Sequence, residues 1–455
     1  MRTPRRTERR LSPTGSSWTP SVSSSAYRST SEAAGIGSSA TSTPSLRRYR
    51  RSRLSGGTTT PDRCRPSVFV AVPRHRSWMM PGAGLSAGVA SVRFLGTRLV
   101  AAALLGVLPA LLSHGSAEAA DREDEAAGGA GGWFALPYVF YSPETEFGGG
   151  VTGGFFLGSE RRPSSVQAAV SYTQLAQFSF EFFPEFSLDD DRWRVSVEAA
   201  AREFPDAFYG IGPGASEDDE ETYTSRDVTA RVVVSRRTRG CLRTGLRTDV
   251  SGTDIADVES GGLLDDGAVE GFDGGTVFGA GPVLIWDSRD NAVFPTAGAF
   301  IEIDFLVYDR RTWSDYDFTR LEVDGRRFAS AAGQHVFGLR GYVEIVDGDV
   351  PFFALPRLGG VRLMRGYREG RFRDNCCAAV QFEYRPPLPG RFRGAVFGSV
   401  GAVASSLDGL GRERLELAGG AGLRYRINDA GLHIRADYAL GREGGGFYLT
   451  IGEAF

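Results

Sequence analysis

The chain has 455 residues, of which 60 are Gly and 11% are aromatic, a composition that favours strands over a helical globular fold. Charged residues make up 24% and hydrophobic residues 41%, which excludes a disordered polyelectrolyte and a bundle of membrane helices. All 52 basic residues are Arg. Residues 1–78 hold 15 Arg and three acids, and the rest holds 37 Arg and 52 acids, so we expect no nucleic-acid partner.

A secretory signal peptide is predicted well inside the chain. Arg93 and Arg98 precede an apolar run from Leu99 to Leu112, and Ala117-Glu118-Ala119 has the small residues of a cleavage site. The run is too short for a membrane-spanning helix. Since an internal signal does not direct export, translation is expected to begin at Met79 or Met80. The expected organisation is therefore an untranslated upstream segment or, alternatively, a disordered arm (1–78), a signal peptide (79–119), a short periplasmic N-terminus (120–132) and a barrel (133–455).

Alternating apolar and polar residues predict β-strands throughout the remaining chain. In one stretch Val195, Val197 and Ala199 alternate with polar residues, and in a later one Ile434 and Tyr438 do so. About sixteen such segments occur, and no helical pattern of similar strength competes. They are expected to begin near Phe134, Phe147, Val166, Gln177, Trp193, Thr222, Cys241, Thr276, Ala299, Tyr316, Gln334, Cys376, Phe392, Arg412, Leu432 and Phe447.

The connections between these segments differ in length on the two sides of the predicted sheet. Connections after even-numbered segments are mostly compact, whereas three of the others are long, roughly 202–221, 251–275 and 347–375. Short turns on one side and long loops on the other are typical of a transmembrane barrel. The predicted fold is therefore all-β, an antiparallel barrel of about sixteen strands in the outer membrane of a Gram-negative-type cell envelope.

The last nine residues, FYLTIGEAF, end the chain on an aromatic residue. Phe447, Leu449, Ile451 and Phe455 are expected on one face, which resembles the C-terminal insertion signal of outer-membrane barrels. Glu453 falls in the same outward register, where a charge near a strand end is tolerated.

The segment Arg365-Gly366-Tyr367, inside the long loop 347–375, resembles a conserved loop motif of the bacterial surface antigen superfamily, which includes BamA, TamA and the two-partner secretion transporters. Three other stretches match the style of this family: 136–150, 286–298 and 381–388. The resemblance implies that the loop folds into the barrel lumen. It also implies an assembly or translocation barrel, here without the POTRA domains that usually precede it.

In this family the loop Arg is held by a strand motif, F-x-D-x-G. The corresponding residues here are Phe397, Ser399 and Gly401, so Ser replaces the Asp. Because a charge-assisted hydrogen bond is about twice as strong as a neutral one, Arg365 is expected either to bind Ser399 weakly or to choose a lumenal carboxylate such as Glu383. A solvated loop Arg is the alternative.

No catalytic constellation, metal-ligand pattern or cofactor motif stands out. The glycine-rich stretch 209–215 is followed by the acidic run 217–221, which disfavours phosphate, and the chain has no G-x-S-x-G elbow. We expect no enzyme, no metal and no cofactor.

Two functions are therefore compared. The first is assistance in the insertion or translocation of a client, through a seam between residues 134–141 and 447–455. Its partners would be outer-membrane lipid, an unfolded outer-membrane or secreted protein or a lipid as client, and an accessory periplasmic protein. The second is a passive pore or a surface-exposed structural barrel.

Overall fold

The computed structural model describes residues 132–157, 164–331, 334–428 and 431–455. The predicted upstream segment, signal peptide and nearly all of the short N-terminus lie outside these residues. Within the described ranges, no helix is both long and apolar enough to cross a membrane.

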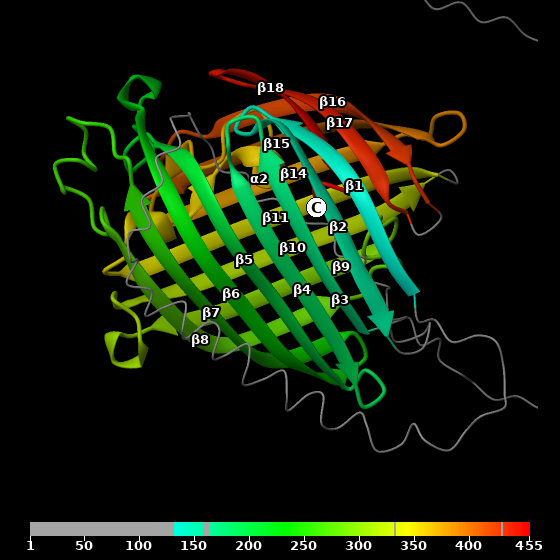
Figure 1. Ribbon diagram of the computed structural model, residues 1–455. Coiled ribbons are helices and arrows are strands. Elements are labelled where there is room, and N and C mark those ends of the chain that lie inside the picture. Colours follow the sequence, from blue (N-terminus) through cyan, green and yellow to red (C-terminus); the bar gives the residue numbers. More distant parts are fainter. Residues whose placement is uncertain (1–131, 158–163, 332–333, 429–430) are drawn as a thin grey trace, which may run out of the picture. The chain divides into compact units, whose positions relative to one another are not determined.

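Sixteen of the described strands form one closed antiparallel barrel, in which neighbours in sequence are neighbours in space (Figure 1). The predicted fold class is thus confirmed. The strands of the barrel are β1 (Gly132–Ser142), β2 (Glu146–Leu157), β3 (Ser164–Thr173), β4 (Phe178–Leu188), β5 (Trp193–Phe208), β6 (Glu221–Arg239), β7 (Leu242–Ala256), β8 (Gly274–Asp287), β9 (Gly298–Tyr308), β10 (Phe318–Ala331), β11 (His335–Gly348), β14 (Cys376–Arg385), β15 (Phe392–Ala404), β16 (Glu416–Arg426), β17 (His433–Gly441) and β18 (Gly444–Ile451).

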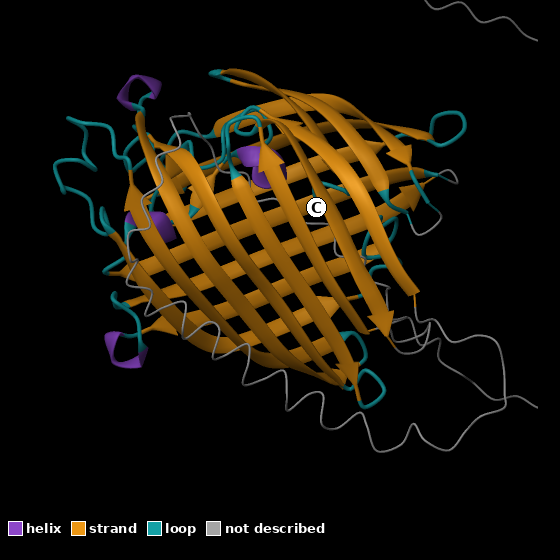
Figure 2. Cartoon of the chain, viewed as in Figure 1, coloured by secondary structure: helices purple, strands orange, loops and turns teal. Residues whose placement is uncertain are grey.

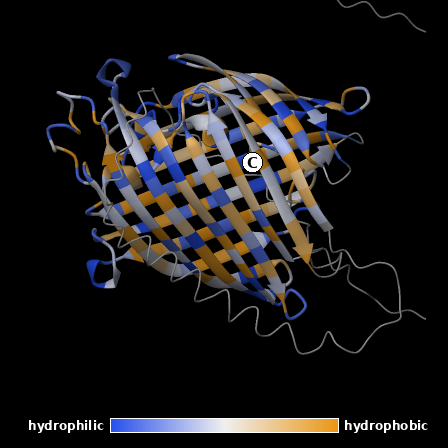
Figure 3. Cartoon of the chain, viewed as in Figure 1, coloured by the Kyte–Doolittle hydropathy of each residue, from blue (hydrophilic) through white to orange (hydrophobic). Residues whose placement is uncertain are grey.

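The period-two pattern sorts side chains between the outer wall and the lumen. In β9, Ile301, Ile303 and Phe305 are exposed on the outside, whereas Asp304 and Leu306 are buried inside. Figure 3 shows the same alternation of hydrophobic and hydrophilic residues along the other strands. An apolar outer wall around a polar interior is the arrangement that a barrel requires in lipid.

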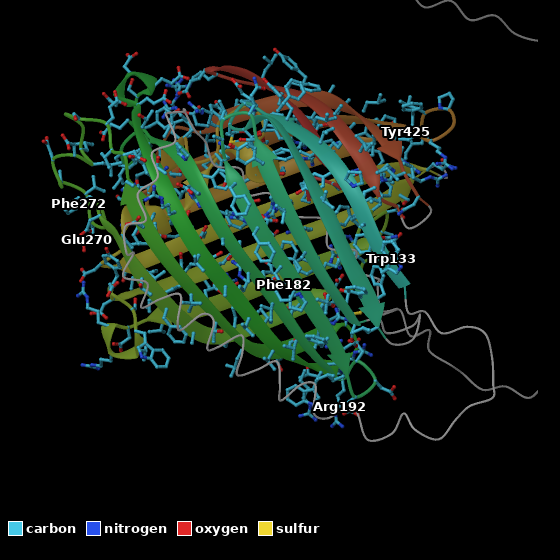
Figure 4. The ribbon with its side chains drawn as sticks, viewed as in Figure 1. Trp133, Phe182, Arg192, Glu270, Phe272 and Tyr425 are labelled. Atoms are coloured by element: carbon cyan, nitrogen blue, oxygen red, sulfur yellow. The ribbon has the colours of Figure 1, made fainter. Side chains whose placement is uncertain are left out.

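The two ends of the barrel are unlike each other (Figure 2). At one end the chain turns in short connections such as 189–192 and 240–241, and at the other it forms the long loops 209–220, 257–273 and 349–375. Figure 4 places Glu270 and Phe272 at the long-loop end and Trp133, Arg192 and Tyr425 at the short-turn end. In an outer-membrane barrel the short turns face the periplasm.

Several element boundaries differ from the predicted ones. β5 and β7 extend to Phe208 and Ala256, so their loops are shorter than expected; Phe208 still pairs with Glu221 although alternation has stopped. β16 begins at Glu416 rather than near Arg412, because residues 409–413 form turns closed by hydrogen bonds to the Gly409 carbonyl. β18 begins at Gly444, earlier than expected, since glycines without a hydropathy signal still pair with β17.

The loop 349–375 carries small elements of its own. These are η3 (Phe352–Ala354), α2 (Gly360–Leu363) and a two-stranded sheet of β12 (Arg357–Leu358) and β13 (Phe372–Arg373). Two further 3-10 turns, η1 (Glu217–Asp219) and η2 (Arg310–Thr312), lie in other long-loop connections.

The barrel closes where β1 meets β18. Within the described residues these strands share one registered pair, Tyr141↔Leu449, whereas β1 pairs with β2 along its whole length. β18 ends at Ile451, so the part of β1 nearest the short turns has no registered partner on that side. A strand edge without a partner is unfavourable in lipid.

The expected face of the C-terminus is partly wrong. Phe447 does lie on the outer wall, but Phe455 is buried and stacks on Phe328, with a centroid distance of 6.1 Å. The expected outward position of Glu453 is also wrong, because its carboxylate contacts the buried Arg424. The chain leaves the sheet after Ile451 and turns inward, which breaks the period of two.

Replacing Ile303 by Arg, in the middle of the outer face of β9, is expected to lower the free energy of unfolding by about 2–4 kcal/mol, because an outward charge must be desolvated in lipid. Urea unfolding in bilayers measures it. The I303L variant is the control, and equal stability of the two variants would show that this face does not meet lipid.

Candidate functional site

Arg365 is the central contact of the lumenal loop. It is buried, and its guanidinium lies 2.7 Å from a Glu383 oxygen on β14 and 2.5 Å from an Asp437 oxygen on β17. The same group lies over the Phe397 ring of β15, 3.4 Å from the centroid. One planar cation thus binds two carboxylates and an aromatic face, which suits Arg and not Lys.

Gly366 and Tyr367 continue the attachment to the following strands. The Gly366 amide donates to the Tyr448 hydroxyl of β18 at 3.0 Å. Gly366 has φ +108°, and a Cβ there would lie 2.8 Å from the Leu440 carbonyl carbon, so only glycine fits. The Tyr367 hydroxyl donates to Glu416 of β16 at 2.8 Å. Together the three motif residues contact all five strands from β14 to β18.

The carboxylates that hold Arg365 belong to a larger buried ion network. Arg424 contacts Asp437 directly and lies 3.3 Å from Glu383, and Glu383 also accepts from Arg385 at 2.7 Å. The network alternates charges, so each buried ion has a counter-ion, which offsets its desolvation. Its members are Arg365, Glu383, Arg385, Arg424, Arg435, Asp437 and Glu453.

The three residues that match the family's strand motif have separate positions. Phe397 lies under the Arg365 guanidinium. Ser399 pairs with Gln381 and Ala418 in the sheet, and no hydrogen bond joins it to Arg365 within the described residues. A Cβ on Gly401 would lie 2.8 Å from Leu358 of the loop, so this glycine allows the loop to pack close to the wall. The charge absent at position 399 is supplied by neighbouring strands.

The loop also contacts β11 and β14 and, across the lumen, the β5–β6 connection. Arg340 and Gln381 both donate to the Arg362 carbonyl at 3.0 Å. Arg368 lies 2.8 Å from Glu220, and Arg371 lies 2.8 Å from Glu443 at the β17–β18 turn. The loop therefore spans the lumen.

Apolar packing holds the same loop from two sides. Leu358, Met364 and Phe372 pack with Cys377 and Val403 of the wall. At the long-loop end a second buried cluster joins the beginning of the loop to the strand tips and to loop 257–273: Phe208, Tyr223, Leu264, Val269, Val277, Leu306, Tyr308, Tyr316, Phe318, Val346, Phe352 and Leu355. This cluster packs over the loop at the long-loop end of the barrel.

Sequence reasoning missed Asp437, Tyr448 and Glu416. Asp437 stands on the polar face of an alternating strand, so its lumenal direction was readable but its partner was not. Tyr448 alternates with Phe447 and Leu449 and therefore also points inward. Their partners are separated from them by tens of residues, and only the closed sheet brings them together.

Glu144 ties the loop to the β1–β2 turn. Its carboxyl is 1% exposed and accepts from the Glu369 amide at 3.3 Å. Burial raises the pKa of the Glu144 carboxyl from 4.5 to about 7, and it outweighs the hydrogen bond to Ser142 and the weaker effect of the Arg368 charge, which both lower this pKa.

Comparison with known proteins adds the family. Residues 161–455 match the Omp85 superfamily domain. Among solved structures, BamA from Haemophilus ducreyi lacking POTRA domains 1–3 is 14% identical, with a TM-score of 0.51 over 71% of this chain and 70% of that chain. CdiB from Acinetobacter baumannii is 14% identical, with a TM-score of 0.47 over 70% of this chain and 59% of that chain. No curated protein matches the chain. The likeness to BamA shows the fold alone.

Replacing Arg365 by Ala should lower the free energy of unfolding by about 3–5 kcal/mol, because Glu383 and Asp437 lose a buried counter-ion. Heat-dependent gel mobility and guanidinium unfolding measure it. Arg368→Ala, at the more exposed ion pair with Glu220, should cost less than about 1 kcal/mol. Equal losses in the two variants would contradict the central role of Arg365.

The raised pKa of Glu144 makes stability depend on pH. The folded state binds its proton more tightly than the unfolded state, so stability falls as pH rises from about 4.5 through about 7. Glu144→Gln should remove this fall, and at pH 8 it should be more stable than the wild type by on the order of 2–3 kcal/mol. Thermal unfolding at pH 4.5 and 8 tests it, with the exposed Glu217→Gln as control. A pH-independent difference would refute the assignment.

Proposed function

Because the chain belongs to the Omp85 superfamily and is a protein of the outer membrane, we propose that its barrel assists the insertion or translocation of a protein or lipid client at that membrane. Proteins of this superfamily insert or transport other molecules rather than act as enzymes. The step proposed is the entry of the client into the membrane through the barrel, and the seam and the lumenal loop are the parts that would control it.

The observation that carries the proposal is the uneven attachment around the seam. On one side, Arg365, Gly366 and Tyr367 tie the strands β14 to β18 together through the loop. On the other side, β1 meets β18 at the single pair Tyr141↔Leu449. A closure with so few backbone hydrogen bonds is the place where the barrel opens at the lowest free-energy cost.

The unpaired part of β1 is suited to a client strand. Residues 132–137 have no registered partner in β18 within the described residues, so their backbone groups on that side are open to pairing, although Pro137 offers no N–H. A client β-strand could pair there, as strands add to sheet edges in other complexes. The inward turn of Glu453 and Phe455 keeps the C-terminus from covering this edge.

A segment can pair with such an edge only while its own backbone is unpaired, which is the state of this chain's C-terminus before folding. The C-terminal segment with Phe447, Leu449, Ile451 and Phe455 is proposed to act as the insertion signal of this chain before folding. Phe455 then moves into the lumen when the barrel closes. The two states use the same residues at different times.

A passive pore is the second candidate. It is favoured by a lumenal cavity of about 610 Å³ whose lining includes Arg194, Arg231, Glu198 and Glu302. The loop network, which spans the lumen, argues for the first function instead.

A disulfide across the seam tests the proposal. The double variant Tyr141→Cys with Leu449→Cys joins registered neighbours, whose spacing suits a disulfide. Oxidation should slow the folding of an outer-membrane barrel precursor into proteoliposomes at least about tenfold, if client entry costs the opening of this seam. Reduction should restore the rate.

The matched control links the same residue to its other neighbour. Ala436→Cys with Leu449→Cys joins β17 to β18, which stay paired in the proposal. It should leave the rate unchanged. An equal rate for the oxidised and reduced seam variant would rule out lateral opening at β1 and β18.

A further inference from the structure

A cavity of about 610 Å³ lies in the lumen beside the loop. Val361 and Arg362 of α2 line it from the loop, and Glu453 and Phe455 line it from the C-terminal tail. This volume falls in the range of small-molecule sites. Arg435 and Glu453 of the buried ion network reach its lining, whereas Arg365, Gly366 and Tyr367 do not.

One wall of the cavity is apolar although it faces a polar lumen. Phe134 and Leu136 of β1 and Phe156 of β2 line it, and the rings of Phe134 and Phe156 stack at 5.7 Å. The outer face of β1 is apolar as well, with Trp133 75% and Val139 64% exposed. β1 therefore departs from the rule of one polar and one apolar face. Half-buried apolar side chains facing water are unfavourable, and a hydrocarbon chain would cover them.

A second wall offers buried cationic donors. Arg435 is 3% exposed and donates its Nε to Thr450 at 3.0 Å, but its Nη1 has no hydrogen-bond partner within the described residues. The Nη1 of Arg243, across the lumen, also has no hydrogen-bond partner within the described residues. Buried donors without a partner are costly, and a carboxylate is the natural acceptor for a guanidinium.

The apolar wall and Arg435 line the same cavity. β17, which carries Arg435, is the second neighbour of β1 through β18. The stretch of β1 without a registered partner in β18, which includes Phe134 and Leu136, lies on the same side of the barrel.

From these observations we infer that the cavity binds a fatty acid, with its carboxylate on Arg435 and its alkyl chain along Phe134, Leu136 and Phe156. A ligand with both parts satisfies both walls. The acidic segment 121–125, which precedes β1 in the sequence, is the alternative occupant; it would pair with the arginines but would leave the apolar wall uncovered. The inference does not depend on the proposed function, since a passive barrel would bind the same ligand.

Fluorescence titration of the full chain with dansyl-labelled undecanoic acid, displaced by unlabelled palmitate, tests this site. Leu136→Trp fills the space of the alkyl chain and should weaken palmitate binding at least about tenfold, because the ligand loses buried apolar contact. Val139→Trp, on the outer face of the same strand, is the matched control and should bind like the wild type.

A second pair of variants tests the head group. Arg435→Gln should weaken palmitate about tenfold and leave hexadecanol unchanged, whereas Arg327→Gln, exposed at the end of β10, should change neither. The alcohol comparison keeps the test valid if Arg435→Gln loosens the barrel, because a loose barrel would lose both ligands.

Three results would overturn the inference. The first is binding that palmitate does not displace, and the second is equal loss in Leu136→Trp and Val139→Trp. The third is binding that appears only when residues 121–125 are deleted, which would assign the cavity to that segment. The seam disulfide experiment reports on the client step separately, so failure of one idea leaves the other measurable.

Discussion

The buried contact of Arg365 with Glu383 and Asp437 is the interaction on which the lumenal architecture depends. A guanidinium removed from water is stable only beside its counter-ions, so the loop that carries Arg365 must lie against β14 and β17. Gly366 and Tyr367 directly follow Arg365 in the sequence, so its position also places them against β16 and β18. The long loop is thereby fixed across the lumen rather than extended into solvent.

This attachment divides the barrel into two unequal parts. The strands β14 to β18 are joined to each other twice, through the sheet and through the loop. β1 is joined to β18 by one registered pair and to the loop through Glu144 in the turn that follows it. The weakly paired seam therefore lies beside the group of strands that the loop holds together, and Phe134 and Leu136 of β1 line the lumenal cavity.

The barrel itself was readable from the sequence, because alternation in a lipid-facing wall is imposed residue by residue. Strand starts such as Trp193, Cys376 and Phe392 coincide with the predicted ones. Prediction failed where the backbone path does not follow the hydropathy pattern of the side chains. This happens at the glycines that begin β18 and at the inward turn after Ile451. In those places pairing or burial decides the path, and the hydropathy pattern carries no signal.

The site was predicted only in part for a related reason. The loop motif was visible because its residues are adjacent, and Glu383 was a reasonable candidate because it stands on an alternating strand. Asp437 and Tyr448 could not be assigned to Arg365 and Gly366, since their proximity arises from closure of the sheet across the chain's last third. Such contacts become visible only once the strand order is known.

Conductance in planar lipid bilayers tests most directly whether the Arg365 loop fills the lumen. The barrel, residues 120–455, is compared with a variant in which a short Gly-Ser linker replaces 355–373. The account predicts a nearly silent intact barrel and a steady, large conductance after the replacement. Equal and steady conductance from both proteins would contradict it and leave an open pore.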